Sequence, residues 1–186
     1  ETQTLLKTAL LLFAVRKQML SQDYAKVDEI LAVSDMDELS PIINDEILFY
    51  EKVIRNFIII RDLIDAFSSG KPTRTDTRLD ITTIRTKRLE AAVKQAEESD
   101  LYTAEAENYL STGKVLLNLR VAVVNDDWKL VDQVLKDSRT TDLAEQVAEE
   151  LKCIQDLADD KNLVFELREV LSGGKATGDV GNVNVD

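Results

Sequence analysis

The sequence repeats itself at one offset, 104 residues, and this limits the possible folds more than any other feature. Residues 16–71 align with residues 120–175 without a gap, and 12 of these 56 positions are identical, where unrelated segments would share roughly three to four. At this offset the chain would hold about one and four-fifths copies of a unit, so we expect it to be a fragment of a longer tandem array.

The composition and the apolar spacing favour helices within each unit. The apolar share is 44% but the aromatic share is only 5%, with 6 Gly and 2 Pro, a balance that favours long helices over a turn-rich sandwich. Leu89, Val93 and Ala96 keep the spacing of a helix with one apolar face. We therefore predict an all-α tandem helical repeat, with a unit of about 104 residues and roughly four helices, whose helical hairpins stack into an elongated array.

The repeat and the glycine positions divide the chain into four predicted segments. Residues 1–71 would be the C-terminal part of a first helical repeat, 72–82 a basic Thr-rich joint, 83–175 a complete second repeat, and 176–186 a Gly-rich joint toward a further repeat. Within the complete unit we expect helices from near Ile84, over about 103–125, from Asp127, and over roughly 141–171.

The repeated polar residues have structural explanations. Asp23 and Asp127 fit helix N-caps, because a carboxylate accepts hydrogen bonds from free backbone amides. Gly70 and Gly174 fit helix C-caps, where glycine takes the left-handed conformation.

An ion pair is the simplest role for the repeated arginines. Arg16 and Asp28, like Arg120 and Asp132, lie on the two sides of one tight helix–helix turn, so we expect a pair that locks the hairpin. The apolar spacing predicts that four repeated residues are buried: Val27, Leu31, Val131 and Leu135.

Charge and residue types exclude several functions. The formal net charge of −12 argues against binding to nucleic acid or an anionic membrane, because such partners need clustered positive charge. There is no His and one Cys, Cys153, which removes the commonest acid–base catalyst, a His/Cys zinc site and an intrachain disulfide. We expect no enzyme activity, no cofactor and no metal, although a reaction that uses only carboxylates, Lys and Tyr is a minor alternative.

Two further features bear on location. The unpaired Cys153, expected to be a small core residue, favours a reducing compartment. The apolar stretch from Thr8 to Val15 is far shorter than the roughly 20 residues of a membrane span, and we expect it to form a buried helix of a cytoplasmic protein.

A short basic strip interrupts the acidic background. Between residues 71 and 88 the charge is +4, and the strip is rich in Thr. Either it is a solvated joint, or it binds an acidic polypeptide, which phosphorylation of the threonines would oppose. The candidate partner-binding residues are Lys71, Arg74, Arg78, Arg85, Lys87 and Arg88 in this strip, and Trp128, which either packs in its hairpin or contacts a partner.

These features favour a non-enzymatic scaffold, part of a large helical-repeat protein that binds other proteins and neighbouring repeats of its own chain. Helical arrays of long period often serve the cytoskeleton or the cilium, so we expect that setting by analogy. The alternative is a regulatory or adaptor domain of a multidomain enzyme, which captures a peptide helix in an apolar groove.

Overall fold

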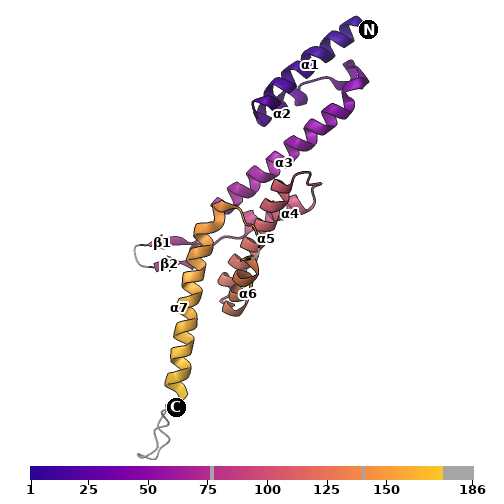
Figure 1. The fold of residues 1–186 in the computed structure, drawn as a ribbon. Helices are drawn as coiled ribbons and strands as arrows, with labels where there is room; N and C mark the ends of the chain where they lie inside the picture. Colours follow the sequence, from indigo (N-terminus) through magenta and orange to yellow (C-terminus); the bar gives the residue numbers. More distant parts are fainter. Residues whose placement is uncertain (76–77, 140, 174–186) are drawn as a thin grey trace, which may run out of the picture.

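The computed structural model describes residues 1–75, 78–139 and 141–173, and over these the protein is an elongated helical rod (Figure 1). The helices are α1 (Thr2–Leu20), α2 (Tyr24–Ala32), α3 (Asn44–Ser68), α4 (Lys87–Glu97), α5 (Ala104–Val124), α6 (Trp128–Ser138) and α7 (Ala148–Gly173). Short 3₁₀ turns are η1 (Met36–Glu38), η2 (Pro41–Ile43), η3 (Ile81–Thr83) and η4 (Glu145–Val147). The all-α prediction is confirmed, with one addition, since β1 (Thr73–Thr75) and β2 (Arg78–Asp80) pair as a small antiparallel hairpin.

Two tight helix–helix turns, α1–α2 and α5–α6, are built alike. Asp23 accepts a hydrogen bond from the Lys26 amide, and Asp127 from the Leu130 amide, each at 3.1 Å, so both predicted N-caps are confirmed. The residue before each cap has a positive φ, 57° at Gln22 and 55° at Asp126. This left-handed residue closes the preceding helix and reverses the chain.

Helix α3 belongs to two separate cores. Its N-terminal half packs with α1 and α2, and Ile47 and Ile54 lie there among Val15 and Val27. Its C-terminal half packs against α4 and α5, and Leu63 is fully buried in that second core. One continuous helix therefore joins the first part of the rod to the second.

A third core lies among α5, α6 and the N-terminal half of α7. Leu119, Val131 and Leu135 are buried in it together with Ile154 and Ala158. Beyond Ala158 the side chains of α7 are exposed as far as its last turn, and in Figure 1 this half of the helix projects away from the rest of the molecule.

The predictions of burial are confirmed at three of four positions. Val27, Val131 and Leu135 are buried, but Leu31 is only half-buried, because it lies in the last turn of the short helix α2 at the margin of its core. Cys153 is a free thiol and half-buried, so its expected place in the core holds only in part.

The stretch from Thr8 to Val15 is helical, as predicted, but only one face of it is buried. Thr8, Leu11 and Val15 point into the protein while Leu10 and Phe13 are exposed, because no other helix of the described ranges covers the outer side of α1. None of the helices in the described ranges has both the length and the apolarity needed to cross a membrane.

Candidate functional site

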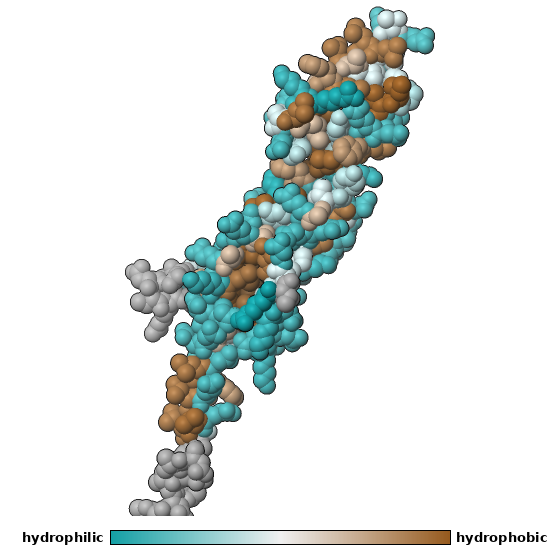
Figure 2. Space-filling view, viewed as in Figure 1, coloured by the Kyte–Doolittle hydropathy of each residue, from teal (hydrophilic) through white to brown (hydrophobic). Residues whose placement is uncertain are grey.

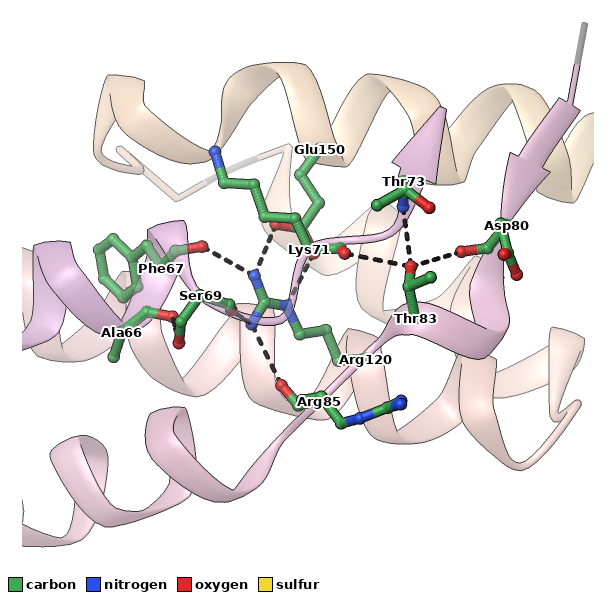
Figure 3. Close-up of polar contacts among 10 residues, drawn as sticks. All are labelled: Ala66, Phe67, Ser69, Lys71, Thr73, Asp80, Thr83, Arg85, Arg120 and Glu150. Carbon is green, nitrogen blue, oxygen red and sulfur yellow. Dashed lines mark hydrogen bonds and ion pairs between the residues drawn. The ribbon is translucent and has the colours of Figure 1, made fainter. Parts of the chain in front are cut away.

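The predicted basic strip is a loop and hairpin between α3 and α4, and its base is held by backbone contacts. Gly70 has φ 66°, and a Cβ there would lie 2.4 Å from the Arg85 carbonyl oxygen, so only glycine fits this close approach. The Thr83 hydroxyl accepts a hydrogen bond from the Thr73 amide at 2.9 Å and donates to the Asp80 carbonyl oxygen at 2.8 Å (Figure 3). Gly174, the other predicted cap, lies outside the described residues.

The cationic side chains of the strip are not all free for a partner. The Arg85 guanidinium donates to the carbonyl oxygens of Thr82 and Ile84, at 2.7 and 2.8 Å. Arg88 lies 3.6 Å from the Asp65 carboxylate, and Lys87 is exposed. Lys71 is half-buried at the start of the loop. The backbones of Arg74 and Arg78 lie in β1 and β2.

Trp128 belongs to a different place, the groove between α6 and α7. Its indole N–H donates to the Asp126 carboxylate at 2.5 Å, and the Lys161 ammonium lies 5.2 Å from the ring centroid, a cation–π distance. These contacts favour the hairpin-packing interpretation. The groove has a volume of about 610 Å³ and also takes in Phe165 and Arg168.

The most highly connected polar residue is Arg120, for which the sequence predicted an ion pair but not the partners that it has. Its side chain is completely buried and makes two hydrogen bonds to the Glu150 carboxylate, at 2.7 and 2.8 Å. It also donates to the carbonyl oxygens of Phe67 at 2.8 Å, Ser69 at 2.7 Å and Arg85 at 3.5 Å (Figure 3). All five guanidinium N–H groups therefore have acceptors.

Arg120 closes the end of α3 as well as pairing with Glu150. The carbonyl groups of Phe67 and Ser69 lie at the C-terminus of α3, where the last carbonyls of a helix have no partner within the helix and attract positive charge. One side chain of α5 thus binds α3, α7 and the chain that leads into α4.

Arg16 makes the same ion pair at the position 104 residues earlier. Its guanidinium donates to both carboxylate oxygens of Glu46, each at 2.7 Å. The side chains of Arg16 and Glu46 are 57% and 29% exposed, against 0% and 2% for Arg120 and Glu150. Arg16 and the Tyr50 hydroxyl, which also bonds to the carboxylate, lower the pKa of Glu46 to about 2.

The predicted pairs of Arg16 with Asp28 and of Arg120 with Asp132 are therefore wrong. The glutamate follows each arginine by 30 residues and lies on a different helix, so the pairs join α1 to α3 and α5 to α7. Asp132 instead accepts a hydrogen bond from Asn162 of α7. The signal was present in the sequence, because Glu46 and Glu150 are themselves a repeated pair.

Two extended apolar surfaces are exposed among the described residues. The first is the outer face of α1, where a hollow of about 750 Å³ is lined by residues that include Leu12, Phe13, Arg16 and Leu20; Phe13 is 70% exposed and Leu20 88%. The second is the projecting half of α7. Its exposed apolar residues are Leu163, Val164, Phe165, Leu167, Val170 and Leu171. Figure 2 shows hydrophobic residues gathered near both ends of the rod.

No family model, curated protein or solved structure matches the chain. Within the described ranges, no group of three or more His, Cys, Asp or Glu side chains is placed to hold a metal ion.

Proposed function

We propose that this chain is a non-enzymatic scaffold built from tandem helical units of about 104 residues, and that its exposed helix faces bind proteins. The observation that carries the proposal is that residues 104 positions apart make the same side-chain contacts. The Asp23 and Asp127 caps match, as do the Arg16–Glu46 and Arg120–Glu150 pairs.

A further matched pair of hydrogen bonds supports the same reading. The Thr8 hydroxyl accepts from the Ser40 amide at 2.9 Å, and the Thr112 hydroxyl accepts from the Ala144 amide at 3.0 Å. In both places the contact is followed by a 3₁₀ turn and a long helix, η2 and α3 or η4 and α7. Shared side-chain contacts of this kind are not required of any two helical hairpins, so they favour repeated units over chance similarity of amphipathic helices.

An experimental structure of residues 1–186 tests the repeated architecture. We expect residues 16–71 and 120–175 to superpose as equivalent units, with the same helix order and both Arg–Glu pairs present. A different number or direction of helices in the two segments would defeat the tandem-repeat part of the proposal.

The scaffold role is tested by recovery of partners from native extract on the immobilised chain, with and without the positive charge of Arg74, Arg78, Arg85 and Arg88. If the strip binds acidic polypeptides, neutralising these four arginines reduces recovery of a subset of partners and leaves the far-UV circular dichroism unchanged. Binding of that subset also falls as salt rises toward 1 M, where the Debye length is about 3 Å. Equal recovery by both forms excludes the strip, and no recovery by either excludes the scaffold role.

The second candidate function is an adaptor domain of a multidomain enzyme, located like the scaffold in the cytoplasm. The apolar hollow on α1 favours it, because its exposed Phe13 and Leu20 could take the apolar stripe of a peptide helix. The parent sequence separates the two candidates: further copies at the same period favour a cytoskeletal or ciliary scaffold, whereas an adjoining catalytic domain favours the adaptor.

A further inference from the structure

The two uncovered apolar surfaces correspond to the two sides of one contact that already exists inside the chain, the packing of α3 against α5. At the 104-residue offset α1 is the counterpart of α5, and α7 is the counterpart of α3. The chain therefore exposes one half of this contact on α1 and the other half on α7.

On the α5 side the contact is close and centred on Gly113. A Cβ at Gly113 would lie 3.3 Å from the Leu63 side chain and 3.5 Å from the Phe67 ring. Tyr109 stacks on Phe67 with the ring centroids 6.2 Å apart, and Leu116 is fully buried beside them. The counterparts on α1 are Leu5, Ala9 and Leu12, which lie along one face of that helix.

On the α3 side the contact is made by a stripe that recurs in α7. The buried apolar residues in the C-terminal half of α3 are Ile59, Leu63, Ala66 and Phe67, each at most 3% exposed. Their counterparts in α7 are Leu163, Leu167, Val170 and Leu171, which are all apolar and between 52% and 74% exposed. The spacing i, i+4, i+7, i+8 puts them on one side of the helix.

The hydrogen bonds of the contact also have counterparts at the two surfaces, a donor on α1 and carbonyl acceptors on α7. Arg120 donates to the carbonyl oxygens of Phe67 and Ser69 at the end of α3. Arg16 donates to Glu46 through two of its five N–H groups and interacts with the Tyr50 hydroxyl, which leaves N–H groups for acceptors from outside. The counterparts of the two carbonyl groups are those of Leu171 and Gly173, in the last turn of α7.

We infer that the chain associates head to tail, with the C-terminal half of α7 of one copy bound along the α1 face of a second copy, and with Arg16 of the second copy closing the end of that α7. The inference rests on the tandem-repeat architecture proposed above. Because the two surfaces differ, each copy keeps one free surface after pairing, and association continues beyond the dimer. Inside the chain α4 also packs against both α3 and α5. The described part of a second copy offers α7 alone for this face, so we expect association to be reversible.

Sedimentation analysis of the full chain over a range of concentrations tests this, with one blocking variant at each surface. Ala9→Glu places a charge at the closest approach on α1, and Leu167→Glu places one in the α7 stripe. Both residues are exposed, so these variants keep the helical circular dichroism. We expect the average mass of the wild type to rise past that of a dimer, and each variant to weaken association at least about tenfold, which corresponds to about 1.4 kcal/mol.

Two control variants separate docking from general stickiness. Leu10→Lys removes a 61% exposed leucine at the position where α5 carries Lys114, and Phe165→Glu removes a 63% exposed phenylalanine where α3 carries the exposed Arg61. Head-to-tail docking leaves both controls associating like the wild type. If the controls lose association as strongly as the blocking variants, the apolar surfaces are merely adhesive and the inference is wrong.

Mixing the two blocking variants shows whether α7 of one copy binds α1 of another. Ala9→Glu retains an unaltered α7 surface and Leu167→Glu retains an unaltered α1 surface. The mixture therefore forms a dimer that neither variant forms alone. If Leu167→Glu still associates by itself, α1 pairs with α1 and the head-to-tail inference fails. A wild type that stays monomeric at every concentration also overturns it, yet leaves the repeated units intact, since those are judged by superposition of residues 16–71 and 120–175.

Discussion

The two Arg–Glu pairs provide an internal comparison of the same interaction at different burial. Replacing Arg120 by Met leaves the Glu150 carboxylate buried without its cation, and removing one partner of a buried pair typically costs about 3–5 kcal/mol. The carbonyl oxygens of Phe67 and Ser69 lose their donor as well. Arg16→Met removes the same two bonds to Glu46 from a side chain that is 57% exposed, where water replaces them.

Urea unfolding measured by Trp128 fluorescence and by far-UV circular dichroism checks this expectation. Arg120→Met should shift the midpoint strongly, and Arg16→Met should shift it much less. The double variant Arg120→Met, Glu150→Leu should recover part of the loss, because it removes the unpaired charge but not the two unsatisfied carbonyl groups. Equal shifts for the two single variants would refute the reasoning that burial sets the strength of these pairs.

Three further outcomes follow from single positions. Leu135→Ala, in the third core, should cost about 2–5 kcal/mol of unfolding free energy, and Leu31→Ala should cost less because Leu31 is half-buried; urea midpoints compare them. Gly70→Ala should lower the melting temperature measured by circular dichroism, since its Cβ would lie 2.4 Å from the Arg85 carbonyl oxygen, and an unchanged melting temperature would contradict that contact. The pKa of Glu46 is lowered to about 2, so its contribution to stability is full above an unfolded pKa of about 4.3 and is lost as pH falls toward 2; Glu46→Gln should remove this part of the pH dependence of the urea midpoint.

Local signals in the sequence were enough to predict the presence of the helices and the two aspartate caps, although the last helix begins at Ala148 and not near residue 141. Asp23 and Asp127 stand before apolar periodic segments, and both accept the expected amide hydrogen bonds. The tight turns were predicted too, but not their backbone conformation, because Gln22 and Asp126 take positive φ values that residues other than glycine seldom adopt.

Contacts between distant segments were predicted less well. The short separation in sequence suggested that Arg120 pairs with Asp132, but the guanidinium points across the bundle to Glu150 and to the end of α3. The joint was predicted as a basic, Thr-rich segment without strands being assigned to it, yet β1 and β2 pair there, since three-residue strands carry too little pattern to be detected. The exposed stripe of α7 could have been found by comparing it with α3, whose counterparts are buried.

The sharing of α3 between two cores has a mechanical consequence. At 1.5 Å per residue its 25 residues form a strut about 37 Å long, and no loop interrupts it between Ile54 in one core and Ile59 in the next. A sharp bend of the rod at this point requires breaking backbone hydrogen bonds of the helix, so tension or torque applied to α1 is expected to pass through α3 to α5. The two parts of the rod are therefore kept at a fixed spacing and a fixed angle about its axis.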